Sequence, residues 1–183
     1  EAEAGISNVV VAMINSAIKD QNTQNYTSAS TKLADAYNYS KKDTLYLYFA
    51  ASNSVNGKDY DTALKYYNQL TDLGFSGIET LYYATEVETN EEVKIPSKQE
   101  RDLLVLGKTH INPTEKKSES KRGEIAKNIA LIYMSQGNNE KALEAMANAR
   151  AENPDDLMLV RSEANIYLEM NQLDKYKEIM QEV

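Results

Sequence analysis

The sequence has no cysteine, no tryptophan and a single histidine, His110, among its 183 residues. Without cysteine the chain forms no disulfide, no thiolate metal site and no cysteine nucleophile. One histidine excludes the motifs in which two histidines hold a metal ion. The seven glycines form neither a GxxxxGK[ST] nor a GxGxxG loop, so these phosphate-binding motifs are absent as well. We therefore predict no catalytic residues, no metal, no cofactor and a protein that is not an enzyme.

Long apolar segments and an excess of positive charge are also missing. The longest apolar run without tyrosine, Val9 to Ile14, is only six residues long, whereas a membrane helix needs about 20. The formal net charge is −8, which disfavours the neutralisation of phosphates on which nonspecific nucleic-acid binding depends. We expect no transmembrane segment and no nucleic-acid partner.

What the chain does contain is an internal repeat, clearest from Gly123 to Asp156. Three small residues stand where two helices must approach closely, an aromatic residue fills one side, a glycine marks a turn and a proline ends the unit. These residues are Ala130, Ala142, Ala149, Tyr133, Gly137 and Pro154. Their positions in the unit are 8, 20, 27, 11, 15 and 32, counted from Gly123.

This spacing resembles the 34-residue tetratricopeptide-repeat (TPR) pattern, in which small residues, an aromatic residue, glycine and proline hold the same positions. The resemblance implies an all-α fold of stacked helical hairpins, because a single hairpin cannot bury both of its apolar faces. Further copies start at residues 10, 44 and 157, and the last copy is cut short at Val183. We predict a solenoid of about four repeats, with residues 1–9 as a tail or helix start, two repeats over 10–77 and two over 123–183.

Residues 78–122 interrupt the repeats. The segment from Thr80 to Val87 is rich in β-branched and aromatic residues, and Val93 to Ile95 follows a turn, which favours a short β-hairpin. A helix starting at Ile78 is the alternative. Ser97 and Glu100 form a capping box that predicts a helix from Lys98 to about Leu106. We expect the remainder, with Lys116, Lys117, Lys121 and Arg122, to be an exposed basic loop.

The resemblance also implies where a partner binds, because TPR proteins line a concave groove with positions 5 and 9 of each first helix. We predict a partner-binding groove from the later repeats of the chain: Tyr48, Ser52, Lys127, Leu131, Arg161 and Asn165. Arg161 and Asn165 are similar to the Lys and Asn pairs by which chaperone-binding TPR domains hold a peptide carboxylate, but Leu131 departs from that pattern. We also predict Tyr82 and Tyr83 as a second partner contact, in the insertion.

The resulting hypothesis is that the chain is a non-catalytic scaffold that binds a protein or peptide, and that it comes from a bacterium. The alternative is a structural segment of a larger solenoid or cell-envelope assembly. We expect Met180 and Val183 to be uncapped, which favours further chain or self-association through the C-terminal repeat. The absence of an initiating methionine and the richness in Lys, Asn, Ser and Tyr suggest the periplasm or envelope, with the cytoplasm as the other possibility.

Overall fold

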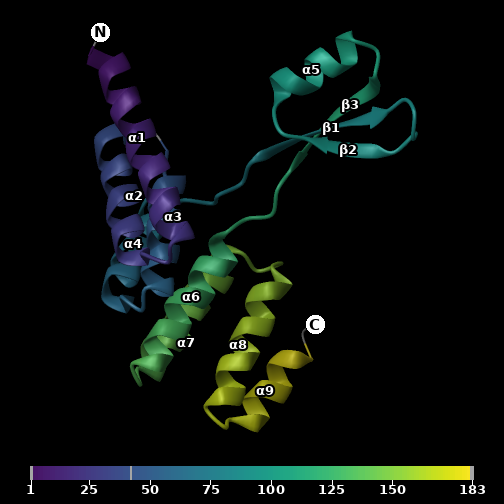
Figure 1. Ribbon diagram of the computed structural model, residues 1–183. Helices are drawn as coiled ribbons and strands as arrows, with labels where there is room; N and C mark the ends of the chain where they lie inside the picture. Colours follow the sequence, from purple (N-terminus) through teal and green to yellow (C-terminus); the bar gives the residue numbers. More distant parts are fainter. Residues whose placement is uncertain (1, 42, 182–183) are drawn as a thin grey trace. The chain divides into compact units, whose positions relative to one another are not determined.

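The protein is described by a computed structural model that covers residues 2–41 and 43–181. Nine helices and three strands occur in these ranges, and the chain divides into two compact units, Glu1–Phe75 with Arg122–Val183 and Ser76–Lys121. The larger unit holds eight helices: α1 (Ala2–Asn22), α2 (Tyr26–Ser40), α3 (Leu45–Asn56), α4 (Tyr60–Asp72), α6 (Arg122–Ser135), α7 (Asn139–Glu152), α8 (Leu157–Glu169) and α9 (Leu173–Met180). Figure 1 shows these helices in successive antiparallel pairs.

Each repeat is one such pair of helices. The predicted period recurs in the backbone conformation of the turn that joins the two helices. Position 15 of the repeat is Gln24, Lys58, Gly137 or Asn171, and all four residues have a left-handed backbone with φ between 58° and 74°. Only the third copy has the glycine that this conformation favours. The turn geometry is thus the same in four repeats even where the sequence departs from the pattern.

Replacing Lys58 by glycine is expected to raise the free energy of unfolding by about 0.5–1 kcal/mol, because a left-handed backbone strains any residue with a Cβ atom. Replacing Gly137 by alanine should lower it by about 1 kcal/mol for the same reason. Urea unfolding followed by circular dichroism measures both changes. A Lys58→Gly protein that is no more stable than the wild type would show that Lys58 carries no strain.

We call α1, α3, α6 and α8 the A helices and α2, α4, α7 and α9 the B helices. The stack of helices continues across the insertion, because α6 packs against α4. In the sequence, 49 residues lie between the end of α4 at Asp72 and the start of α6 at Arg122. Leu47 and Leu70 from the second repeat share one buried cluster with Ile125 and Ile129 of α6. Beyond it, α6, α7 and α8 share a buried cluster that contains Ala126, Ala130 and Ala142, and α9 packs on α8.

The smaller unit is a three-stranded antiparallel sheet with one helix. Its elements are β1 (Thr80–Glu86), β2 (Glu92–Ile95), α5 (Lys98–Leu106) and β3 (His110–Lys117), with strand order β2-β1-β3. The predicted β-hairpin is confirmed as β1 and β2, and the alternative helix from Ile78 is wrong. Ser97 caps α5 by accepting a hydrogen bond from the Glu100 amide at 3.2 Å.

The expectation of a basic loop after α5 is wrong over His110–Lys117, which is strand β3. Its sequence is polar and contains Pro113, which removes a backbone donor. The strand forms because it is an edge strand paired with β1, where a proline can be accommodated. Asn112 and Pro113 lie opposite Ala84 as a β-bulge, and Asn112 has a left-handed φ of 49°.

Candidate functional site

The A helices of the last two repeats expose the residues predicted for a groove. Lys127 and Leu131 lie four residues apart on α6, and Arg161 and Asn165 have the same spacing on α8, so each pair shares one helix face. All four residues are exposed, and α6 packs against α8. We call the exposed side of these two helices the A-helix surface.

Apolar side chains accompany these polar residues on the A-helix surface. Leu131 is 40% exposed and Leu168 is 44% exposed. Leu131 also lines a shallow hollow of about 330 Å³ together with Met134 of α6, and with Glu169 and Met170 at the end of α8. The surface therefore offers both apolar contact area and two cations.

Tyr48 occupies a different place from the one predicted for it. The side chain is only 6% exposed, and its ring lies 6.0 Å from that of Phe75. Its hydroxyl donates a hydrogen bond to Glu124 Oε1 at 2.7 Å. Burial raises the pKa of Tyr48, and the Glu124 carboxylate raises it further. Tyr48 thus joins the second repeat to α6 and is not part of the A-helix surface. Ser52 on the same helix is half-buried.

A second buried tyrosine fixes the same junction. The Tyr67 hydroxyl accepts a hydrogen bond from Asn128 Nδ2 at 3.0 Å, and Tyr67 is 1% exposed. Burial raises the pKa of Tyr67 to about 12. Glu124 and Asn128 are one turn apart on α6, so these two polar residues set the position of α6 on the second repeat.

The two insertion tyrosines lie on opposite faces of the sheet, because successive residues of a strand alternate. Tyr82 faces α5, where the Arg101 guanidinium lies 5.3 Å from its ring centroid. Tyr83 is on the other face, with Lys116 Nζ 4.5 Å from its ring. Tyr83 and Tyr82 are both half-buried, and they do not form one joint contact patch.

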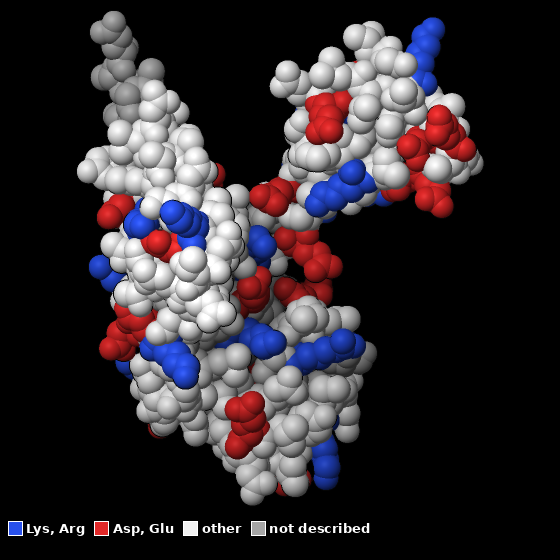
Figure 2. Space-filling view, in the orientation of Figure 1, with Lys and Arg blue, Asp and Glu red and all other residues white. Residues whose placement is uncertain are grey.

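No three His, Cys, Asp or Glu residues lie together as a metal site among the residues that the structure describes. His110 begins β3, and its Nδ1 lies 3.0 Å from the hydroxyl of its neighbour Thr109. No helix in residues 2–41 and 43–181 is long and apolar enough to cross a membrane. On the face drawn in Figure 2, positive and negative side chains are interspersed.

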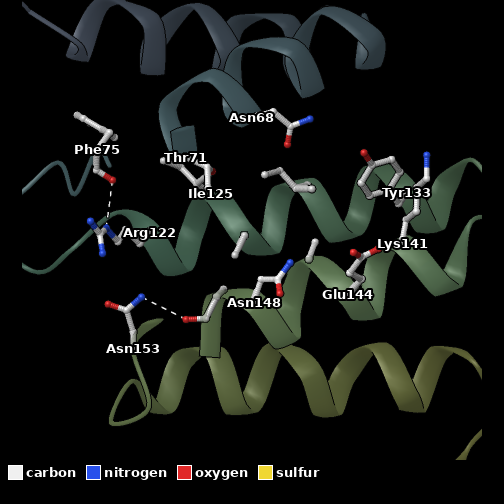
Figure 3. Close-up of a pocket in the computed structure, with 14 residues that line it drawn as sticks. Asn68, Thr71, Phe75, Arg122, Ile125, Tyr133, Lys141, Glu144, Asn148 and Asn153 are labelled. Atoms are coloured by element: carbon white, nitrogen blue, oxygen red, sulfur yellow. Dashed lines mark hydrogen bonds between the residues drawn. The ribbon is translucent and has the colours of Figure 1, made fainter. Parts of the chain in front are cut away.

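A second concave feature was not predicted from the sequence. It is a cleft of about 300 Å³ between α4, α6 and α7, which we call the α4–α7 cleft (Figure 3). Ile125 and Ile129 form its floor, and Asn68 and Asn148 extend from the walls on either side. The signal that could have revealed it is the small size of Ala145, at the repeat position held by Tyr66 in α4.

Comparison with known proteins identifies the fold. No protein-family model matches the chain, and no curated protein sequence matches it. Among solved structures, a tetratricopeptide-repeat protein from Parabacteroides merdae aligns with a TM-score of 0.59 and 13% identity, over 96% of this chain and 52% of its own. The chain thus spans about half the length of that protein.

MamA is similar too. Its crystal structure aligns with a TM-score of 0.54 and 12% identity over 96% of this chain and 76% of MamA. A MamA segment from Desulfovibrio magneticus RS-1 gives the same TM-score and identity over 94% and 72%. At these identities the likeness establishes the fold: the chain is a tetratricopeptide-repeat solenoid with a β insertion.

Proposed function

We propose that the chain is a non-catalytic scaffold that binds a peptide or an extended segment of another protein along the A-helix surface. The observation that carries the proposal is the exposed stripe on α6 and α8, where Lys127 and Arg161 stand beside Leu131 and Leu168. Apolar side chains supply contact area when they leave water, and cations select the charge of the partner.

The charges favour a partner with acidic residues or a terminal carboxylate. Arg161 offers a planar, two-pronged donor that matches a carboxylate, and Lys127 offers a point charge. Neither side chain forms an ion pair with another residue that the structure describes. The stack holds α6 and α8 in place before a partner arrives, which lowers the entropy lost on binding.

Reversing both charges, with Lys127→Glu and Arg161→Glu, is expected to weaken peptide binding by tenfold or more, equivalent to about 1.4 kcal/mol. Peptides would first be selected on the purified wild-type protein from a displayed random library. Fluorescence polarisation with the synthetic peptides then measures the affinity. The matched control is Lys65→Glu with Lys177→Glu, which makes the same charge change on exposed residues of the B helices α4 and α9.

The control pair should leave the affinity within about twofold, since both sites lie off the A-helix surface. Equal loss in both double variants would mean that net charge alone decides binding and would overturn the assignment to the groove. Loss of binding in a Tyr83→Ala protein, without loss in the groove variant, would place the partner on the insertion.

A structural role in a larger solenoid or envelope assembly is the second candidate. The observation that favours it is the apolar exposure of the last repeat, where Leu173 is 48% and Met180 is 37% exposed. Val183, which was also predicted to be uncovered, lies outside the described residues. Failure to select any peptide, together with a mass that rises with concentration in analytical ultracentrifugation, would favour self-association through this repeat.

A further inference from the structure

The second repeat shows how the space between two successive hairpins can be filled. Tyr66 extends from α4 and packs on Leu33 and Ala34 of α2 and Ala50 of α3. At position 23 of the repeat, this ring closes the space between successive hairpins. The same position is Lys32 in the first repeat and Ile179 in the last, where Ile179 packs within its own hairpin on Val160 and Ala164 of α8.

Between α4 and α7 this side chain is missing. Position 23 of the third repeat is Ala145, where α4 has Tyr66. A large ring is thus replaced by a methyl group at this junction. The α4–α7 cleft is the space that remains, and Ala145 lines it together with Ala149.

The lining of the cleft suits an aromatic side chain. Ile125 and Ile129 are buried residues that form an apolar floor, and Tyr133 ends the cleft with a ring that can pair with a second ring. Asn68 and Asn148 offer amide donors and acceptors on the two walls, as Figure 3 shows. A volume of about 300 Å³ is at the lower limit for small-molecule pockets, so the cleft has the size for one or two side chains.

Two cations and one carboxylate surround this lining. Lys141 Nζ lies 5.5 Å from the Tyr133 ring centroid, and the Arg122 guanidinium is held by the carbonyl oxygens of Gly74 at 3.0 Å and Phe75 at 3.4 Å. Glu144 is the acidic residue of the lining. Among the described residues of the lining, cations outnumber carboxylates, which favours an aromatic side chain that has a carboxylate close to it.

We propose that the α4–α7 cleft is a second binding site, which accepts a tyrosine side chain from an acidic polypeptide segment in the place where Tyr66 stands one repeat earlier. This site goes beyond the proposed groove, because it is built from α4, α6 and α7 and needs neither Arg161 nor Asn165. A partner that used both sites would contact the B helices as well as the A helices.

N-acetyl-L-tyrosine is the probe, because it carries the ring and one carboxylate. Titration into the ¹⁵N-labelled full chain should shift the amide signals of residues around Ile129, Ala145 and Asn148, with a dissociation constant of about 1–10 mM, as expected for so small a ligand. N-acetyl-L-tyrosinamide, which is neutral, should bind several-fold more weakly. N-acetyl-L-alanine, which lacks the ring, should leave the same signals unshifted.

The test variant is Ala145→Tyr, which supplies the ring from the chain itself. This variant should keep the fold and abolish the shifts. If Ala145→Tyr does not fold, Ala149→Leu replaces it as the test variant. Ala149→Leu introduces the residue that α4 has at this position, and it should weaken probe binding at least threefold. The Lys127→Glu and Arg161→Glu double variant should bind the probe as the wild type does. The cleft proposal and the groove proposal can therefore fail independently of each other. Absence of shifts at the cleft in the wild type, or unchanged binding in the filled variants, would overturn the proposal.

Discussion

Replacing Arg101 by alanine is expected to release α5 from the sheet of the Ser76–Lys121 unit while the helical repeats stay folded. Arg101 is 6% exposed, and among the described residues of this unit the only large buried apolar side chain is Ile95. The guanidinium covers the Tyr82 ring and bonds to Asp102 Oδ1 at 2.8 Å and to Glu115 Oε1 at 3.1 Å. A charged side chain thus holds the place of a core residue.

The effect should be large because so short a unit has little other burial to stabilise it. Both acidic partners are half-exposed, so the ion pairs alone contribute modestly. Most of the loss comes from the aliphatic stem and from the guanidinium over Tyr82. Hydrogen exchange of the α5 and β3 amides should accelerate roughly thirtyfold or more, with exchange in α3 and α8 unchanged.

Two conservative variants separate these causes. Arg101→Met keeps the apolar stem without the charge, and Arg101→Lys keeps the charge without the planar fork. If the guanidinium stacking matters, both variants exchange faster than the wild type. A methionine variant with wild-type exchange rates would show that only the stem is needed, and an alanine variant with wild-type rates would contradict the structural role of Arg101.

The features that could be predicted from the sequence depend on near neighbours in the chain. The repeats follow from a fixed spacing of small residues such as Ala130 and Ala142, and the α5 boundary follows from the capping pair Ser97 and Glu100. The hairpin of β1 and β2 is joined by a short turn, so its strands carry their own pairing signal.

The features that could not be predicted depend on pairings between distant segments. Strand β3 exists because β1 lies beside it, and its own residues do not favour a strand. Tyr48 is buried because α6, beyond the insertion, packs on it, and Glu124 accepts a hydrogen bond from its hydroxyl. The groove positions on α6 and α8 were easier to predict, since helix periodicity alone turns Lys127 and Arg161 outward.

The α4–α7 cleft belongs to neither group. Ala145 fits the repeat pattern as well as Tyr66 does, so a comparison with the pattern gives no warning of a missing side chain. The difference becomes meaningful only when the two residues are seen to occupy equivalent places between B helices. Departures between repeats of one chain thus deserve the same scrutiny as departures from a family pattern.

Replacing Tyr67 by phenylalanine is expected to make the protein less sensitive to alkaline pH. Burial raises the pKa of Tyr67 to about 12, whereas an unfolded tyrosine titrates near pH 10. Between these values the unfolded chain has lost the proton that the folded chain still binds. The stabilisation associated with the neutral hydroxyl is therefore complete below about pH 10 and is lost as pH rises through about pH 12.

The size of the effect follows from the linkage between proton binding and stability. Each pH unit in this interval lowers the wild-type free energy of unfolding by about 1.4 kcal/mol through Tyr67 alone. At about pH 8 the Tyr67→Phe protein should be less stable by about 1 kcal/mol, because the hydrogen bond from Asn128 is lost. The two stability curves should then cross between about pH 10 and pH 12.

Urea unfolding at a series of pH values measures both curves, and lysine deprotonation affects the two proteins alike, so it cancels in their difference. The matched control is Tyr39→Phe, because that ring is 60% exposed, and its curve should run parallel to the wild type at every pH. Parallel curves for Tyr67→Phe as well would mean that the Tyr67 hydroxyl titrates as freely as a surface tyrosine. The junction between α4 and α6 would then admit water, and the close packing of Tyr67 against the second and third repeats would be wrong.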